Sequence, residues 1–151
     1  MQKRITVIGG GTGSYTVLKG LSKLNKFKLY AIVTTMDDGG STGILKDELG
    51  ILPPGDARQC LVALSKSSNL MRQLLMYRFD SGTLNGHNFG NILIAALTKI
   101  TGSFTEAIRQ SGQLFNINGR VIHVAISGSI LCAELDNNQI IEGEANIVEP
   151  K

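Results

Sequence analysis

A glycine-rich turn is the feature of this chain whose residue types and spacing best suit the binding of a phosphate group. The stretch ITVIGGGTGSYTVLKGL, residues 5 to 21, places four glycines between an apolar run and a helical pattern. Glycines directly after a buried strand let the backbone turn sharply, and the free N–H groups of a following helix attract anions. We therefore expect these residues to form a phosphate-binding turn: Gly9, Gly10, Gly11, Thr12, Gly13 and Ser14.

This turn matches the known nucleotide-binding motifs only in part. Gly9 and Gly11 fill the first two positions of the dinucleotide fingerprint G-x-G-x-x-G, but Ser14 stands at the third. A P-loop needs a lysine at the start of the helix, and Lys19 lies almost two turns along it. A Walker A motif is excluded, and a tight strand-to-helix turn without a ligand stays open as an alternative.

Two adjacent carboxylates, Asp37 and Asp38, follow the second long apolar run of the chain. Ligands of open α/β sheets bind outside the carboxyl ends of the strands, where these side chains and the glycine turn are expected to meet. One carboxylate could accept hydrogen bonds from ribose hydroxyls, or the pair could bind Mg²⁺. Because Asp-Gly is common turn chemistry, a solvated turn is the alternative.

The motif PPGDAR adds one acidic and one positively charged side chain to the candidate site residues. Asp56 is expected either to cap the following helix or to face the ligand. Arg58 would stand in the first helical turn, where it opposes the helix dipole, so an anionic ligand or a partner carboxylate is expected beside it.

The motif NGHNFGN combines a turn with two amides and an imidazole. His87 could act as a general acid or base, or it could form a hydrogen bond at the start of a helix capped by Asn88. His123 lies in an apolar strand pattern and is expected to be structural. The sequence assigns no catalytic residue.

The elements that position these groups follow from hydrophobic patterning. The runs RITVI at 4–8 and KLYAIVTTM at 28–36 are typical of buried parallel strands, and the helical pattern between them completes a βαβ unit. The segment 37–58 is expected to be one long loop. Helices are expected at 59–79 with a break at 67–69, at 88–100 and at 103–111 with a capping box, and short strands at 121–126, 130–135 and 139–144 with no closing helix after them.

Composition narrows the class of protein. The 151 residues are 42% hydrophobic with a net charge of +3 and no basic run, so nucleic acid is not an expected partner. Cys60 and Cys132 lack metal-site spacing. The apolar runs are too short for a signal peptide or a membrane span, so we expect a cytoplasmic protein without membrane insertion.

The segments IGGGTGSYTVLKGL, TTMDDGGSTGILKDELGILPPGDARQCLVAL and LNGHNFGNILIAAL occur together in this order, and the tail LCAELDNNQIIEGEANI follows them. In these motifs and their order the chain resembles the YvcK/CofD-like family, which comprises bacterial gluconeogenesis factors and relatives of 2-phospho-L-lactate transferase. Beyond the glycine turn, the family motifs fall on Asp37, Asp38, Gly39, Gly40, Ser41, Gly55, Asp56, Arg58, His87, Asn88, Gly90 and Asn91.

The resemblance implies a Rossmann-like α/β fold: a parallel sheet with flanking helices, a helical middle and a short β segment at the C-terminal end. Residues 1–151 would be the N-terminal part of a single domain, because family members are considerably longer. The segment VIHVAISGSILCAEL is shorter and less polar than its family counterpart, which would alter the β region beside the site.

For function, the resemblance implies a UDP-sugar as ligand, no required cofactor, and a regulatory role in cell shape and envelope synthesis on gluconeogenic carbon sources. A protein partner in envelope synthesis is implied but not identified, and a homo-oligomer is left open. The transferase branch implies an enzyme that acts on a guanosine diphosphate-linked donor, with Mg²⁺ held by Asp38 and Asp56 and the phosphate neutralised by Arg58. We expect the regulatory binder, while an NAD-dependent oxidoreductase and a purely structural module stay open.

Overall fold

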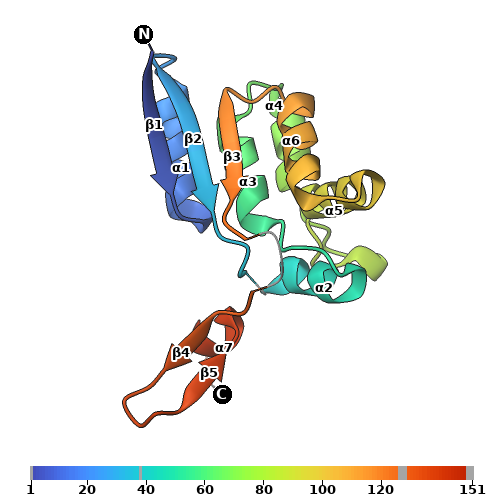
Figure 1. Ribbon diagram of the computed structural model, residues 1–151. Helices are drawn as coiled ribbons and strands as arrows, with labels where there is room; N and C mark the ends of the chain where they lie inside the picture. Colours follow the sequence, from blue (N-terminus) through green and yellow to red (C-terminus); the bar gives the residue numbers. More distant parts are fainter. Residues whose placement is uncertain (1, 38, 126–128, 149–151) are drawn as a thin grey trace.

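The computed structural model describes residues 2–37, 39–125 and 129–148 of the chain (Figure 1). Strands β1 (Lys3–Ile8), β2 (Phe27–Val33) and β3 (Gly119–His123) form a parallel sheet in the order β1-β2-β3. Ile5 lies opposite Leu29, which in turn lies opposite Gly119. Helix α1 (Gly11–Ser22) connects β1 to β2, which confirms the βαβ unit expected from the apolar runs.

One face of this sheet packs on the core. Helices α1, α3 (Gly55–Leu64) and α6 (Phe104–Leu114) supply Leu18, Leu61 and Ile108 to a buried cluster that includes Leu29 and Val33 of β2. Side chains of the opposite face stay accessible, since Ile8 and Ile122 are 77% and 44% exposed.

The segment 37–58 is not the single loop that its glycines and acidic residues predicted. Helix α2 (Gly40–Leu49) lies within it and ends at Gly50, whose φ of 61° is the left-handed conformation typical of a helix end. Leu45 and Leu49 pack against Ala95 and Ile92 on α5 (Phe89–Thr101). This tertiary contact stabilises a helix for which the local sequence gives only a weak apolar pattern.

The predicted helix boundaries in the middle of the chain are largely confirmed. The helix expected at 59–79 is α3 followed by α4 (Asn69–Met76), with the expected break between them. Ser68, Asn88 and Ser103 each accept a hydrogen bond from a backbone N–H three residues further on, which confirms Asn88 as a helix cap. A 3₁₀ turn lies at Gly82–Leu84.

The C-terminal segment forms an antiparallel hairpin of β4 (Cys132–Glu134) and β5 (Ile140–Glu142), which stands away from the sheet in Figure 1. Both strands are shorter than predicted. A short helix, α7 (Glu144–Val148), follows where no closing helix was expected, because Gly143 with φ of 89° turns the chain and its carbonyl accepts the Ile147 N–H. The strand expected at 121–126 is β3, and residue 126 lies outside the described residues.

No helix in the described part of the chain combines the length and apolar character that crossing a bilayer requires.

Candidate functional site

The glycine turn between β1 and α1 already holds a carboxylate. Helix α1 begins at Gly11, and its N-cap residue, Gly10, provides no side-chain hydrogen bond. Instead, Oδ1 of Asp56 accepts the Gly11 N–H at 2.7 Å. A Cβ atom at position 10 would overlap the Asp56 carboxylate, so the second glycine of the motif makes room for an acidic group on α3.

This arrangement corrects the expectation that Asp56 caps its own helix. The N-cap of α3 is Pro54, and Asp56 stands in the first turn with its side chain directed to the other helix. Burial raises the pKa of Asp56, while the Gly11 N–H lowers it, the Asp37 charge raises it and the Arg58 charge lowers it. The carboxyl group therefore occupies the place where an anion would meet the first N–H of α1, and the exposed Thr12 and Gly13 carry the next N–H groups.

Asp37 lies at the same edge of the sheet, between the starts of α2 and α3. Its Oδ1 accepts the Gly39 N–H at 3.0 Å. A Cβ at position 55 would come within 2.6 Å of Asp37 Oδ2 and 2.7 Å of Thr42 Oγ1, which explains the glycine of PPGDAR. Asp38 lies outside the described residues, and among those that are described no group of three or more His, Cys, Asp or Glu side chains could hold a metal ion.

A buried polar network forms around Arg58, which is only 6% exposed. Its Nε donates to Asn91 Oδ1 at 2.8 Å, and its Nη1 contacts Met76 Sδ at 3.0 Å and Leu75 O at 3.5 Å. Asn91 Nδ2 donates in turn to Thr42 Oγ1 at 3.2 Å. The network joins α2, α3, α4 and α5, and it includes Thr42, which the motif pattern did not single out although it directly follows the predicted Ser41.

Neutral groups take the place of the partner carboxylate expected for Arg58. Within the described ranges, no carboxylate lies at ion-pair distance from its guanidinium group. Burial and the nearby Arg78 lower the pKa of Arg58 to about 10, although Asp37 and Asp56 raise it from further away. Arg58 is therefore still charged at neutral pH. The glycine at position 90 leaves room for the Arg58 side chain, because a Cβ there would clash with Leu75 O and lie 2.7 Å from Arg58 Cδ.

The third motif joins this network through Ser41. Ser41 Oγ accepts the Asn88 N–H at 3.1 Å and lies 3.4 Å from His87 Nδ1. Asn88 Oδ1 accepts the Asn91 N–H and Nδ2 donates to Tyr77 O at 3.0 Å. The tertiary structure thus brings together the DDGGST, PPGDAR and NGHNFGN segments, which are distant in sequence. His87 is half-buried, and the ligand contacts predicted for His87, Asn88 and Asn91 stay predictions.

Thr35 is a further candidate that the motif pattern did not reveal. It follows β2 by two residues, is 1% exposed, and its Oγ1 has no hydrogen-bond partner among the described residues. A buried hydroxyl without a partner is costly, so it marks a place where a water molecule or a ligand could bind. Its position two residues before Asp37, the first of the two predicted carboxylates, was the available signal.

The fold and these motifs define a Rossmann-like α/β unit with a polar site at the carboxyl ends of its strands. Residues 5–151 match the family described as 2-phospho-L-lactate transferase CofD, and the chain belongs to this family. The proteins named gluconeogenesis factor from Bacillus subtilis and Halalkalibacterium halodurans are 42% and 44% identical to it over 147 residues. Each alignment covers 97% of this chain, and 46% and 45% of those proteins.

The fold is shared with a solved relative. A crystal structure of a Bacillus halodurans protein is 43% identical to this chain, with a TM-score of 0.92, over 96% of this chain and 47% of that one. The chain thus spans about half the length of the relatives that it matches. This share agrees with an incomplete domain, because parallel sheets are normally covered on both faces and one face here is accessible.

Proposed function

We propose that this chain is part of a cytoplasmic regulatory protein that binds a nucleotide sugar, with a UDP-sugar as ligand. The observation that carries the proposal is the convergence of the three family motifs beside the glycine turn at the carboxyl ends of β1 and β2. Relatives that are 42% and 44% identical to this chain are named gluconeogenesis factor. The site needs no cofactor and performs no turnover.

The residues at this edge have separate roles in the proposed complex. The N–H groups of Thr12 and Gly13 donate to the diphosphate, because they lie at the positive end of α1 and are exposed. Asp37 accepts hydrogen bonds from a ribose or sugar hydroxyl. Arg58 contributes positive potential from within the buried network, and that network fixes the starts of α2 and α5 around the ligand.

The proposed biological role is the support of cell shape and envelope synthesis during growth on gluconeogenic carbon sources. A protein without turnover transmits its ligand state through a partner, so the proposal includes a protein partner in envelope synthesis. The whole protein, which in the relatives is about twice as long, is the molecule to which this role belongs.

A second candidate function is a Mg²⁺-dependent transferase of the phospholactate type. The observation that favours it is the approach of two carboxylates, Asp37 and Asp56, near the glycine turn, where the Asp37 charge raises the pKa of Asp56. Mg²⁺ prefers one or two carboxylates together with phosphate oxygens. In this function Asp56 would hold the metal with a carboxylate of the adjacent Asp37–Asp38 pair, of which the sequence predicted Asp38, and Arg58 would stabilise the transferring phosphate.

Calorimetric titration of UDP-N-acetylglucosamine into the chain, with and without Mg²⁺ and with GDP and NAD as competitors, separates these functions. Saturable binding of the UDP-sugar without Mg²⁺ is the expected result. Mg²⁺-dependent preference for GDP would favour the transferase, and displacement by NAD would favour an oxidoreductase. Absence of binding, both by this chain and by the longer gene product, would contradict the regulatory proposal.

Two glycine variants make this titration specific for the turn. Gly10→Ala is expected to abolish binding, because its methyl group overlaps the Asp56 carboxylate. Gly20→Ala on the same helix is the matched control, because a Cβ there meets nothing within 4 Å. Unchanged binding in both variants would mean that the ligand does not use the turn.

A further inference from the structure

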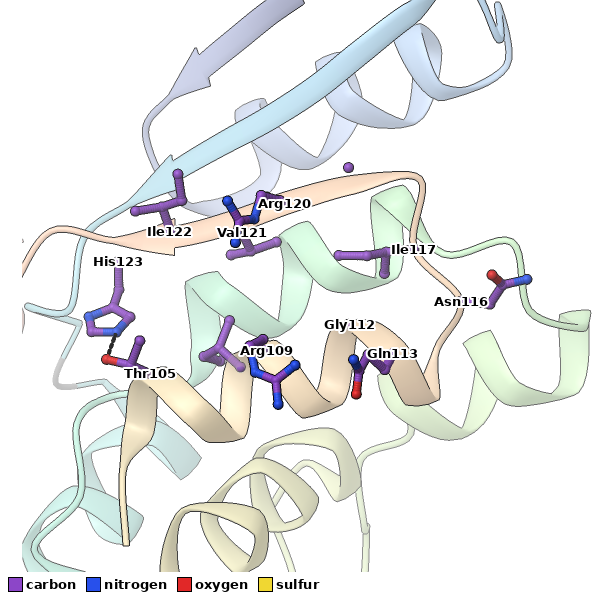
Figure 2. A pocket seen from close by; sticks show the side chains of 12 residues that line it. Thr105, Arg109, Gly112, Gln113, Asn116, Ile117, Arg120, Val121, Ile122 and His123 are labelled. Carbon is purple, nitrogen blue, oxygen red and sulfur yellow. Dashed lines mark hydrogen bonds between the residues drawn. The ribbon is translucent and has the colours of Figure 1, made fainter. Parts of the chain in front are cut away.

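A groove lies between α6 and β3, at the opposite edge of the sheet from β1 and its glycine turn (Figure 2). Its volume is about 660 Å³, and its walls are one face of α6 and the whole length of β3. His123 closes one end, where its Nε2 lies 2.9 Å from Thr105 Oγ1 and its Nδ1 lies 2.6 Å from Ala125 O. The proposed nucleotide site uses none of the residues that line this groove.

The first wall of the groove is an unpaired strand edge. Among the described residues, β3 pairs only with β2. The Val124 N–H donates to Val33 O on β2, and backbone groups of a strand point alternately to its two sides. The N–H and C=O groups of Val121 and His123 therefore face the groove. Such an edge can pair with a further extended segment, which is how peptides bind by strand addition.

The second wall of the groove is the face of α6 that lies beside this edge. Gly112 on α6 has no side chain, and Ile117 packs against it, because a Cβ at position 112 would lie 3.0 Å from Ile117 Cδ1. Ile117 and Val121 lie between the helix and the strand in Figure 2, and with the buried Ile108 they form an apolar floor. An extended segment could place every second side chain on this floor while its backbone pairs with β3.

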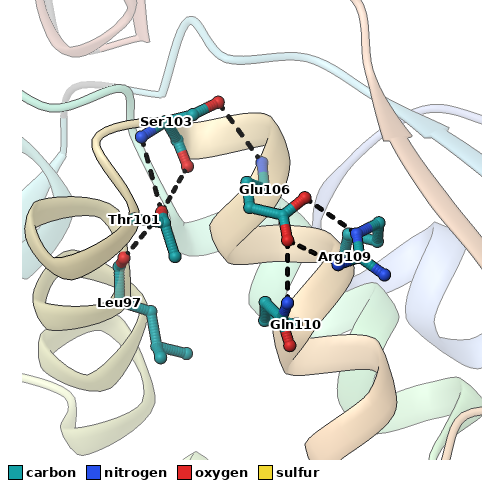
Figure 3. A network of polar contacts seen from close by, with 6 residues as sticks. All are labelled: Leu97, Thr101, Ser103, Glu106, Arg109 and Gln110. Carbon is teal, nitrogen blue, oxygen red and sulfur yellow. Dashed lines mark hydrogen bonds and ion pairs between the residues drawn. The ribbon is translucent and has the colours of Figure 1, made fainter.

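Both ionised side chains in the described lining of the groove are basic. They are Arg109 and Arg120, and none of the described lining residues is acidic. Glu106 lies outside the lining and binds Nε and Nη2 of Arg109 at 2.8 and 2.5 Å. Figure 3 shows the third guanidinium nitrogen of Arg109 pointing away from Glu106. This nitrogen and the exposed Arg120 are available to carboxylates of a bound segment.

We propose that the groove between α6 and β3 binds an extended, acidic segment of a partner protein, which pairs with β3 as an added strand. Main-chain hydrogen bonds to Val121 and His123 align the segment, its apolar side chains contact the floor, and its carboxylates bind Arg109 and Arg120. This proposal is independent of the nucleotide site, and a failure of UDP-sugar binding would leave it unaffected.

The test is an NMR titration of the isotopically labelled 151-residue chain with a short synthetic peptide that alternates glutamate and valine. The expected result is saturable shifts at the amides of Gly119–His123 and along α6, with a Kd below about 1 mM. Two further peptides probe the cause: one alternates lysine and valine, and the other is the glutamate peptide with its backbone nitrogens methylated on one edge. Both are expected to bind at least about tenfold more weakly.

Charge variants locate the site on the protein. Arg120→Glu is expected to weaken binding of the glutamate peptide at least about tenfold, and Arg120→Lys is expected to retain it. Arg72→Glu, which removes a cation on α4, is the matched control and is expected to bind as the unmodified chain does. A dispersed spectrum of each variant checks that it folds, and Arg109→Gln replaces Arg120→Glu if that variant does not.

Four results would overturn the proposal. These are equal binding of the glutamate and lysine peptides, shifts confined to residues outside α6 and β3, no saturable shift up to about 1 mM peptide, and occupation of the groove by a second copy of the chain. The last would appear as a dimer in sedimentation whose labelled interface includes β3.

Discussion

Two polar clusters of this chain contain the same kinds of groups in opposite surroundings. Arg58 is buried and binds an amide oxygen, a carbonyl and a thioether. Arg109 is 50% exposed and forms a fork with the carboxylate of Glu106, which also binds Gln110 Nε2 at 2.7 Å (Figure 3). Burial lowers the pKa of Arg58, whereas the Glu106 hydrogen bond and charge raise the pKa of Arg109.

The difference shows that a carboxylate partner is not what makes an arginine structurally important. Water can replace Glu106 around the exposed guanidinium, so the ion pair adds little to stability. Water cannot easily reach Asn91 Oδ1 or Leu75 O, so these acceptors depend on Arg58. The motif that contains Arg58 therefore has a structural role in addition to the ligand role proposed for it.

Replacement of Arg58 is expected to have the largest effect. Arg58→Ala leaves Asn91 Oδ1 without its donor and opens a cavity, so the free energy of unfolding should fall by about 3 kcal/mol. Urea unfolding with an unchanged m-value measures this loss. Arg109→Ala is the matched control and should barely shift the midpoint. Equal losses in both variants would remove the distinction between the two clusters.

A methyl group at position 90 tests the packing of the same network. Gly90→Ala places Cβ against Leu75 O and Arg58 Cδ, and overpacking of this kind costs about 1–3 kcal/mol. Gly20→Ala should instead raise the melting temperature slightly, because alanine favours a helix interior and meets no neighbour there. Thermal unfolding of both variants compares them, and a stable Gly90→Ala chain would mean that Arg58 can move aside.

The effect of Asp56 on the stability of the folded chain is expected to depend on pH. Burial raises its pKa in the folded chain above the unfolded value, so the folded state favours the neutral acid. As pH rises from about 4 through the raised pKa, the unmodified chain should lose stability relative to Asp56→Asn, whose amide oxygen can still accept the Gly11 N–H. Melting temperatures at several pH values measure this difference. Asp47→Asn on the exposed face of α2 is the control, and a difference that does not grow with pH would contradict the assignment.

The smallest effect is expected at the exposed cluster. The hydrogen bonds from Arg109 and Gln110 lower the pKa of Glu106 to about 2. Arg109→Gln should return this pKa toward the ordinary value of about 4.3 without a measurable change in melting temperature, because both side chains are solvated. A ¹³C NMR titration of the Glu106 carboxyl group follows the pKa. A clear loss of stability would mean that the pair matters more than its exposure suggests.

Local patterns were sufficient for much of the architecture. The apolar runs of β1 and β2, the intervening helix and the caps Ser103 and Asn88 were predicted, because each depends on residues a few positions apart. Helix α2 was missed, since its stability comes from packing on α5. The structure brings described residues of the three motifs together around α2, α3 and α5, and the motifs did not reveal Thr35 or Thr42.

The sequence by itself determined the strand–turn–helix unit, the family and the motif residues, because hydrophobic periodicity, capping and glycine placement are local signals. Only the tertiary structure decided which groups meet. It placed Asp56 on the first N–H of α1, Arg58 against Asn91, and the outer edge of β3 beside α6. The first two contacts join residues 45 and 33 positions apart, and no local pattern encodes them. They arise because helices and strands must bury their apolar faces together, and that packing fixes which polar groups lie side by side.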